Sequence, residues 1–216
     1  MISRYRYIAS ILAALILLAG CGNDPQRGAS LDQIGQIINQ IGPPEPGPTA
    51  AQIRSGLTPE VRAQFGNAPL KVGTIEKPQL ASVLIGVGRN GRVATFTTPD
   101  GVSFAFDDGV LVGTRGLGSD LMTADIGPTR RALNAGSGAG VIRIHRYLDG
   151  EDQIFVRSFV CDISTGSDGT LVEQCKGSAL SFENRYQRRQ DGVVIASRQW
   201  VSPDRGYLTV EDIRNE

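Results

Sequence analysis

The sequence predicts a mainly β protein, an antiparallel meander that forms a sandwich or a partly open barrel, with short helices at its N-terminal side. Two observations support this fold class. Short apolar or alternating runs recur between residues 81 and 213, and glycine-containing turn signals separate them. Alternation with a period of two is the periodicity of a half-buried strand, and turns at close intervals favour antiparallel neighbours.

The first twenty residues have the features of a secretory signal. Arg4 and Arg6 form a basic start, and residues 8–18 are an apolar run that contains a single serine, Ser10. This run is too short to cross a hydrocarbon core of ~30 Å, which needs roughly 20 apolar residues. It leads into Leu-Ala-Gly-Cys ending at Cys21, which resembles the bacterial lipobox, where the cysteine is acylated and the signal is cut before it. We therefore assign residues 1–20 to a lipoprotein signal peptide; the alternative is an ordinary signal peptide with an incidental cysteine.

Lipidation at Cys21 would fix the location of the protein. Two or more acyl chains anchor a protein stably, at ~0.8 kcal/mol per buried CH₂. Gly22 follows the cysteine in place of the aspartate that retains enteric lipoproteins in the inner membrane. We expect an outer-membrane lipoprotein that faces the periplasm. Loss of Arg4 and Arg6 lowers the 22 basic residues to 20 against 22 acidic ones, a net charge of −2, which argues against nucleic acid as a partner.

Residues 21–50 are predicted to be a lipidated tether with one helix. Apolar residues lie on one helical face of residues 30–42, where Ser30 is placed to cap the start and Gly42 the end. A proline-rich spacer over residues 43–48 follows. The apolar face of the helix either packs on the β domain, assigned to residues 51–216, or meets a partner or the membrane.

The first half of the β domain begins with a short helix and continues as a meander. Thr58 as cap and Pro59 in the first turn predict a helix that ends by Gly66. Residues 70–75 are predicted to form an additional edge strand. Strands follow at residues 83–87, 93–98, 102–106 and 110–114. The reversals between them are Asn90-Gly91, predicted as a type I′ turn, Pro99-Asp100-Gly101 and Asp107-Asp108-Gly109.

The second half again alternates strands and turns. Residues 119–134 are predicted to be helical or irregular with an interruption at Pro128, and residues 135–140 to be a flexible joint. Strands are predicted at residues 141–148, 153–163, 170–175, 178–188, 193–201 and 207–213. The glycines of the joint precede a strand, whereas a nucleotide-binding loop follows a strand and opens a helix. We interpret them as structural.

Cys161 and Cys175 are the two cysteines that remain beyond Cys21. They flank a turn-rich segment, and a periplasmic protein is oxidised, so a disulfide is expected between them. Closing a loop of about 15 residues contributes ~3 kcal/mol in the chain-entropy model. A redox or metal site would need a CxxC spacing or an adjacent histidine, and the sequence has neither at these positions.

The sequence assembles no catalytic motif. His145 is the single histidine, no GxSxG motif occurs, and one histidine is a poor basis for a protein zinc site. A glycosidase needs two carboxylates, and Asp107, Asp108 and Asp120 lie near one another in sequence. The first two are better explained as turn residues. We expect a protein with no catalytic residue, no metal and no cofactor.

Arg198 and Trp200 are a candidate sugar contact. They share one face of a predicted strand, and tryptophan beside arginine can bind sugar by stacking and bidentate hydrogen bonding. The alternative is that Trp200 packs in the core or at a sheet edge.

One continuous motif carries a family resemblance. The pattern DGxSxxFxDGVLxxTRGLGxDLM, which runs from Asp100 to Met122, resembles the signature of the YjbF/GfcB family of bacterial lipoproteins, linked to exopolysaccharide and group 4 capsule export. The resemblance extends from the lipidation signal through most of the β region, and it supplies no catalytic residues. It implies a non-catalytic accessory in exopolysaccharide or capsule secretion and assembly. Its partners would be outer-membrane or periplasmic export proteins, with the polysaccharide itself as a further candidate.

Two alternatives to the accessory role stay open: a polysaccharide-modifying enzyme and a carbohydrate-binding module of the periplasm. The most specific part of the signature is the corner Arg115-Gly116-Leu117-Gly118 with Asp120. This corner is either pinned by an Arg115–Asp120 ion pair or forms a docking surface for a partner protein.

Overall fold

The computed structural model describes residues 47–148 and 153–213. The chain separates into two compact units, Met1–Pro46 and Gly47–Glu216. Cys21, the signal peptide and the helix predicted over residues 30–42 lie outside the described residues. No helix in the described ranges is long and apolar enough to cross a membrane.

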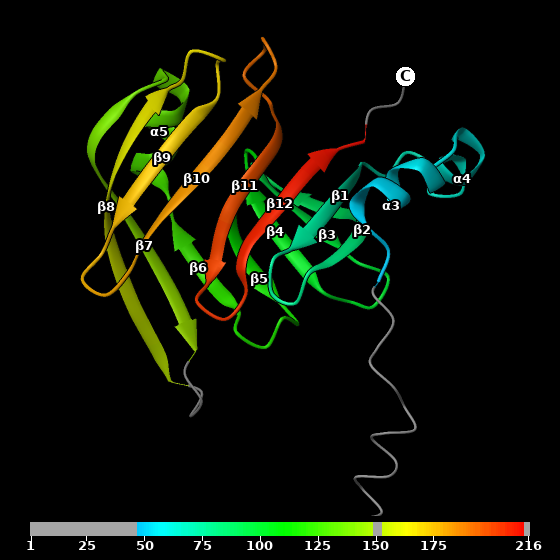
Figure 1. The fold of residues 1–216 in the computed structure, drawn as a ribbon, viewed down its shortest axis with the longest axis horizontal. Coiled ribbons are helices and arrows are strands. Elements are labelled where there is room, and N and C mark those ends of the chain that lie inside the picture. Colours follow the sequence, from blue (N-terminus) through cyan, green and yellow to red (C-terminus); the bar gives the residue numbers. More distant parts are fainter. Residues whose placement is uncertain (1–46, 149–152, 214–216) are drawn as a thin grey trace, which may run out of the picture. The chain divides into compact units, whose positions relative to one another are not determined.

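The second unit is built on one antiparallel sheet of 12 strands (Figure 1). The strands are β1 Leu70–Ile75, β2 Leu80–Asn90, β3 Val93–Thr97, β4 Ser103–Asp107, β5 Val110–Arg115, β6 Leu121–Asp125, β7 Gly138–Leu148, β8 Ile154–Thr165, β9 Leu171–Lys176, β10 Ser181–Arg188, β11 Val194–Ser202 and β12 Gly206–Asp212. The predicted fold class, a mainly antiparallel β protein with few short helices, is confirmed.

The strand order makes the sheet nearly closed and barrel-like. It runs β5-β4-β3-β2-β1-β12-β11-β10-β9-β8-β7-β6, so most neighbours in the sheet are also neighbours in the chain. The first and last strands join through a full antiparallel ladder that pairs Lys71 with Asp212 and Ile75 with Leu208. The two ends of the sheet order are β5 and β6, which a short corner connects. The gap between the two edges of the sheet therefore falls between β5 and β6, in the middle of the chain.

The prediction that residues 70–75 form an edge strand is wrong. β1 lies between β2 and β12 and pairs with both. Val72 and Ile75, which alternation places on opposite faces of the sheet, are both buried. The sequence offers no local sign of this position, because the partner strand β12 begins more than a hundred residues later.

The hairpin turns form where predicted, with one shift. β2 and β3 pair as far as Asn90 and Val93, so the two turn residues are Gly91 and Arg92, not Asn90 and Gly91. Gly91 has φ +58° while Arg92 keeps a negative φ, which is the pattern of a type II′ turn, not the predicted type I′. The two consecutive positive φ angles of a type I′ turn occur instead at Asp108 and Gly109, between β4 and β5.

Three short helices accompany the sheet in the part of the chain that the structure describes. α4 Pro59–Ala63 begins as predicted, with the Thr58 side chain accepting from the Val61 amide and proline in the first turn. α3 Ala50–Gly56 was not predicted, although the sequence carries its signal: Thr49 and Gln52 form a capping box. α5 Gly127–Ala135 follows β6.

The segment from 119 to 140 differs from the predicted helix and joint. Residues 121–125 form β6, and Pro128 lies in the first turn of α5, where its missing amide hydrogen is not needed, so it starts this helix and does not interrupt one. Gly136 ends α5 in the left-handed conformation, φ +79°. From Gly138 onward the predicted joint is already strand β7, with a bulge before Val141.

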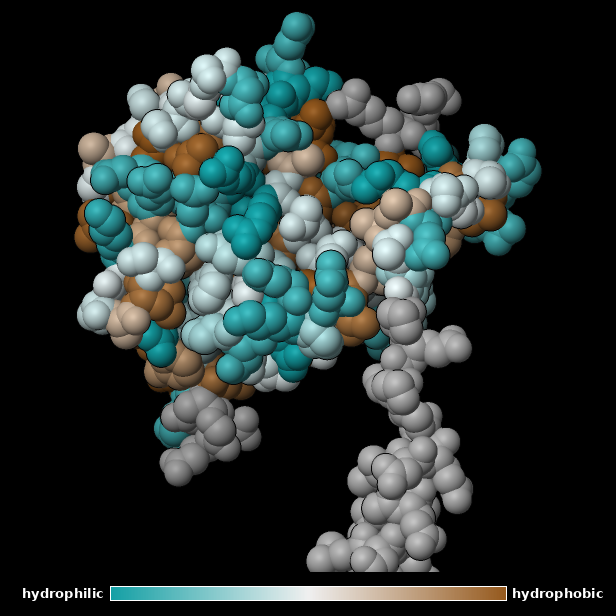
Figure 2. Space-filling view, viewed as in Figure 1, coloured by the Kyte–Doolittle hydropathy of each residue, from teal (hydrophilic) through white to brown (hydrophobic). Residues whose placement is uncertain are grey.

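Apolar side chains from all parts of the sheet fill its interior. One core cluster includes Leu84, Phe96, Leu111, Leu121 and Leu208, and Phe96 meets Phe106 edge-to-face with ring centroids 5.9 Å apart. A second cluster consists of Phe159, Cys161, Cys175 and Phe182, packed against Trp200 and Tyr207. The outside is mostly hydrophilic on the face shown in Figure 2, with smaller apolar patches among the polar residues.

Candidate functional site

A fully buried ion pair lies in the interior, between strands β7 and β9. The Nη1 of Arg143 is 3.0 Å and 3.2 Å from the two carboxylate oxygens of Glu173, and both side chains are 0% exposed. Removing two charges from water is costly, and their mutual attraction compensates only when the remaining polar atoms are also satisfied.

The neighbouring strands satisfy the rest of this pair. Glu173 accepts further hydrogen bonds from the Asn184 amide at 2.7 Å and from the Tyr186 hydroxyl at 2.8 Å. Arg143 donates through Nη2 to the carbonyl of Leu111 on β5, at 3.3 Å. Burial acts to lower the pKa of Arg143, but the charge of Glu173 prevails and raises it. Burial, and next the charge of Glu173, raises the pKa of Tyr186 well above its usual value.

His145 continues this network and is held as a neutral ring. Its Nε2 accepts from the Nε–H of Arg143 at 2.7 Å, which leaves the ring proton on Nδ1, 2.9 Å from the hydroxyl of Tyr147. That hydroxyl donates to the carbonyl of Val201 at 2.9 Å. Burial, and next the charge of Arg143, lowers the pKa of His145 well below its usual value. Both ring nitrogens are therefore occupied by neighbours within the protein.

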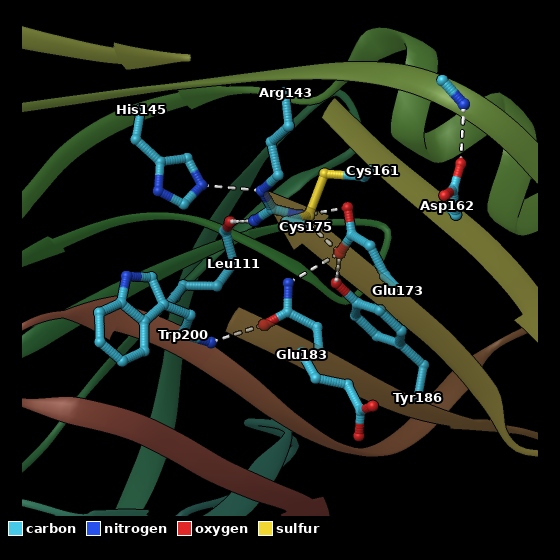
Figure 3. Close-up of a disulfide and its surroundings, with 12 residues drawn as sticks. Leu111, Arg143, His145, Cys161, Asp162, Glu173, Cys175, Glu183, Tyr186 and Trp200 are labelled. Atoms are coloured by element: carbon cyan, nitrogen blue, oxygen red, sulfur yellow. Dashed lines mark hydrogen bonds and ion pairs between the residues drawn. A yellow bond between two sulfur atoms is a disulfide. The ribbon is translucent and has the colours of Figure 1, made fainter. Parts of the chain in front are cut away.

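The predicted disulfide is present beside this network (Figure 3). Cys161 and Cys175 are direct cross-strand partners on β8 and β9, with Cα atoms 4.0 Å apart, and both are buried. Glu173 lies close enough to the two sulfurs to suggest a metal site by distance alone. The chemistry does not fit a metal, because the sulfurs are bonded to each other and the carboxylate is paired with Arg143.

A large cavity opens at one end of the barrel-like sheet. Its volume is about 1090 Å³, and its wall comes from the β2–β3, β4–β5 and β10–β11 turns, from α5, and from the outer ends of β1 and β12. Its buried lining residues include Phe96, Phe106, Leu171 and Tyr186. Because the Tyr186 hydroxyl binds Glu173, the buried ion pair supports the inner end of this cavity.

The turn at Gly109 closes one side of the cavity by reaching across the interior to β11. The side chain of Gln199 donates to the carbonyl of Gly109 at 2.8 Å and accepts from the amide of Leu111 at 2.7 Å. A Cβ atom at Gly109 would lie 2.5 Å from the Cβ of Val194, so only glycine allows this close approach.

Charged side chains of both signs line the cavity. The basic ones are Lys71, Arg89, Arg92, Arg130 and Arg188, and the acidic ones are Asp108, Asp191 and Asp212.

Some of these charges are paired with one another. Arg92 is 3.0 Å from Asp107 and 3.6 Å from Asp108, Arg130 is 3.8 Å from Asp107, and Lys71 pairs with Asp212. The two carboxylates considered for glycosidase chemistry, Asp107 and Asp108, thus hold the β4–β5 turn and bind arginine.

The signature corner lies at the opposite end and joins the two edges of the sheet. Asp120 accepts from the Thr114 hydroxyl at 2.7 Å, the Gly116 amide at 2.9 Å and the Leu117 amide at 3.2 Å. The amide of Leu121 on β6 donates to the Thr114 hydroxyl on β5 at 3.0 Å. These bonds substitute for a main-chain ladder between β5 and β6.

Arg115 strengthens the same joint, although not by the predicted ion pair. Its guanidinium donates to the carbonyls of Leu121 at 3.4 Å and Met122 at 3.1 Å, both on β6. Within the described ranges Arg115 and Asp120 form no ion pair with each other. The corner also binds a neighbouring turn through the Ser119 hydroxyl, which donates to Asp204 at 2.7 Å. The corner is pinned, and whether it also docks a partner remains a prediction.

Arg198 and Trp200 are engaged with other side chains of the protein. Trp200 stacks on Phe182 with centroids 5.8 Å apart and meets Tyr207 edge-on at 5.2 Å. The Arg198 guanidinium lies 3.3 Å from the centroid of the Tyr207 ring and 3.6 Å from a carboxylate oxygen of Glu76. These contacts match the packing alternative for Trp200, and a sugar contact at this place stays a prediction.

Sequence reasoning missed the polar network because the alternation of β7 is inverted. Arg143, His145 and Tyr147 face inward and are buried, whereas Ile142 on the opposite face is 46% exposed. The usual expectation that the apolar residues of a half-buried strand face inward would therefore select the wrong side. The cavity was also missed, because its wall combines strands that only the closed sheet brings together.

Comparison with known proteins connects this architecture to a family. A protein-family model described as "Group 4 capsule polysaccharide lipoprotein gfcB, YjbF" matches residues 56–213. The chain belongs to this family. The match covers the β sheet from before β1 to the end of β12, and it confirms the resemblance seen in the motif between Asp100 and Met122. The family connects the chain with capsule polysaccharide and, as a lipoprotein family, with the cell envelope.

A solved structure supports the fold. The hypothetical lipoprotein YmcC from Escherichia coli K12 is similar with a TM-score of 0.58 and 12% identity, over 88% of this chain and 98% of that chain. At this identity the likeness concerns the fold alone. A search of curated proteins finds no match.

Proposed function

We propose that this family member is a non-catalytic outer-membrane lipoprotein that serves as an accessory in the secretion or assembly of exopolysaccharide or capsule. One observation carries the proposal. The chain belongs to a family described by group 4 capsule polysaccharide, and three residues of the signature motif, Thr114, Arg115 and Asp120, close the sheet between β5 and β6. The features held in common with the family thus maintain a closed shell with a cavity at the far end.

The engagement of the ionisable groups supports a non-catalytic role. A general base must reach a proton of the substrate, and its pKa is best near the working pH. His145 is buried with both nitrogens bonded inside the protein, and its pKa is lowered well below the usual value. Glu173 is fully buried and accepts from three side chains.

Anchoring through Cys21 is part of the proposal. The lipobox-like sequence before Cys21 and the glycine after it favour attachment to the outer membrane, with the β unit in the periplasm. Replacing Cys21 with serine should then abolish incorporation of labelled palmitate, because Cys161 and Cys175 are joined in the disulfide. Palmitate incorporation by this variant would refute the assignment.

The accessory role is tested by deletion and complementation. Deleting the gene should reduce surface polysaccharide while the repeat unit is still made, measured by surface staining and by quantifying lipid-linked repeat units. Complementation with Asp108→Asn should restore export, because asparagine tolerates the positive φ of +50° at this turn and Asp108 is assigned no chemistry. If folded, correctly located Asp108→Asn protein left export abolished, a polysaccharide-modifying enzyme would replace the accessory in our interpretation.

A further inference from the structure

The cavity at the open end has the dimensions of a ligand site. Its volume of about 1090 Å³ is just above the range of ~300–1,000 Å³ typical of small-molecule sites. Phe96 and Phe106 line it as largely buried rings, 4% and 3% exposed, and Tyr186 lies at its inner end. A bulge in β2 between Gly86 and Gly88 forms part of the wall, where Val87 between the two glycines also lines the cavity.

The charges around the cavity are not balanced within the protein. Lys71, Arg92 and Arg130 have carboxylate partners. Across residues 47–148 and 153–213, by contrast, the guanidinium groups of Arg89 and Arg188 have no hydrogen bond or ion pair. The cavity therefore presents unused arginine donors beside apolar and aromatic surface.

The two unpaired arginines come from different strands of the wall. Arg89 lies on β2 and Arg188 on β10, and three strands, β1, β12 and β11, separate these two in the sheet. Arginine binds carboxylate groups through two parallel hydrogen bonds, so two such groups at a mouth select an extended ligand with repeated negative charge.

We propose that this cavity binds a carboxylate-bearing oligosaccharide segment, with Arg89 and Arg188 contacting its acidic groups. The inference rests on the proposed function in polysaccharide secretion and names the ligand class of that function. A sugar chain offers apolar ring faces for the exposed apolar side chains of the lining, Val87 and Val193, and hydroxyl groups for the rim carboxylate of Asp191. A lipid chain would gain little from a lining with this many charged groups.

Calorimetric titration of the purified full-length mature protein in detergent tests the ligand class. The probes are tetramers of galacturonate, mannuronate and sialic acid, with maltotetraose as the neutral control. We expect at least one acidic tetramer to bind at least tenfold more tightly than maltotetraose, and this affinity to fall as salt rises. If none of the three acidic tetramers bound, or if the neutral tetramer bound equally well, the proposal would be overturned.

Matched arginine variants locate the binding. Arg89→Gln with Arg188→Gln should weaken the acidic tetramer at least tenfold, while Arg131→Gln, on an exposed arginine of α5 that does not line the cavity, should leave the affinity within twofold. Circular dichroism checks that each variant is folded. Equal weakening by Arg131→Gln, or no weakening by the double variant, would show that the cavity is not the site.

The outcome for the cavity is separable from the outcome for the accessory role. Binding in vitro decides the ligand class, whereas the deletion strain decides whether the protein supports export. If deletion impaired export and the titrations failed, the accessory role would stand without the ligand proposed for this cavity. If the titrations succeeded and deletion left export unchanged, the cavity would bind an acidic saccharide for a different purpose.

Discussion

Replacing Glu173 with glutamine is expected to destabilise the protein strongly, although the two side chains have nearly the same shape. Arg143 would remain charged and fully buried without its counter-ion, and breaking such a buried pair costs ~3–5 kcal/mol. Part of that cost is local. Glutamine offers one acceptor oxygen where the carboxylate now accepts from Arg143, Asn184 and Tyr186.

Equilibrium urea unfolding with the disulfide intact measures this cost. Glu183→Gln is the matched control one strand away, because Glu183 is one-third exposed at 33% and pairs with the exposed Arg185. Such a surface pair contributes only ~0.2–1 kcal/mol. A fall in the free energy of unfolding of about 4 kcal/mol for Glu173→Gln against less than 1 kcal/mol for Glu183→Gln would fit the geometry.

A double variant tests whether such a loss of stability comes from the unpaired buried charge of Arg143 or from the lost hydrogen-bond acceptor at Glu173. Arg143→Met combined with Glu173→Met removes both charges and keeps apolar volume, so it should recover much of the stability that Glu173→Gln loses. The reasoning is refuted if Glu173→Gln costs less than about 1 kcal/mol, since a buried unpaired guanidinium cannot be that cheap. A double variant that lost the full sum of both single changes would also contradict it, by showing that the charges do not act as a pair.

Three further outcomes follow from the structure. Burial, and next the charge of Arg143, holds the pKa of His145 in the folded state well below its ordinary value of 6.5, so the unfolded chain binds a proton that the native chain does not bind as pH falls through 6.5. The contribution of the neutral His145 ring to the free energy of unfolding should be fully present above pH 6.5 and decline below it by up to about 1.4 kcal/mol per pH unit. His145→Gln should flatten this part of the curve of stability against pH, and an unchanged slope would exclude His145 as its source. Replacing Cys161 and Cys175 together with serine opens a loop spanning 14 positions and should lower stability by ~3 kcal/mol, read from urea unfolding; an effect below 1 kcal/mol would mean that the bridge constrains little. Asp120→Ala removes the acceptor of three hydrogen bonds at the β5–β6 joint and should cost ~2–3 kcal/mol and speed proteolysis there, whereas Asp100→Ala in an exposed turn should cost under ~0.5 kcal/mol; equal effects would argue against the joint.

The fold class was predictable because its signals are local. Turn residues such as Gly91 and Gly109 specify where the chain reverses, and alternation marks the strands between them. The position of β1 was not predictable in this way, since its pairing with β12 depends on a ladder between residues far apart in sequence. Pro128 misled the prediction because it suits both the end of one helix and the beginning of another.

The candidate site was much less accessible to sequence reasoning. Alternation in β7 reports two faces but not which of them points inward, and here the polar face of Arg143 and His145 is the buried one. The charge of Arg143 is compensated by Glu173 on β9, and only the folded sheet places these two side chains side by side. The disulfide was predictable because cysteine has few alternatives in an oxidised compartment, so counting sufficed where geometry was unknown.

The placement of the two joints has a consequence for how the chain folds. Joining β1 to β12 closes a loop of 141 positions between Lys71 and Asp212, and it is secured by a complete ladder of main-chain bonds. Joining β5 to β6 closes only a short corner, and side chains of Thr114, Arg115 and Asp120 suffice to hold it. The entropy lost on closing a loop grows with the length of the loop. The longer loop, closed by β1 and β12, therefore costs more to close, and it is the one held by a complete main-chain ladder. During folding the short joint can form locally between β5 and β6, but the shell stays open until the last strand, β12, pairs with β1.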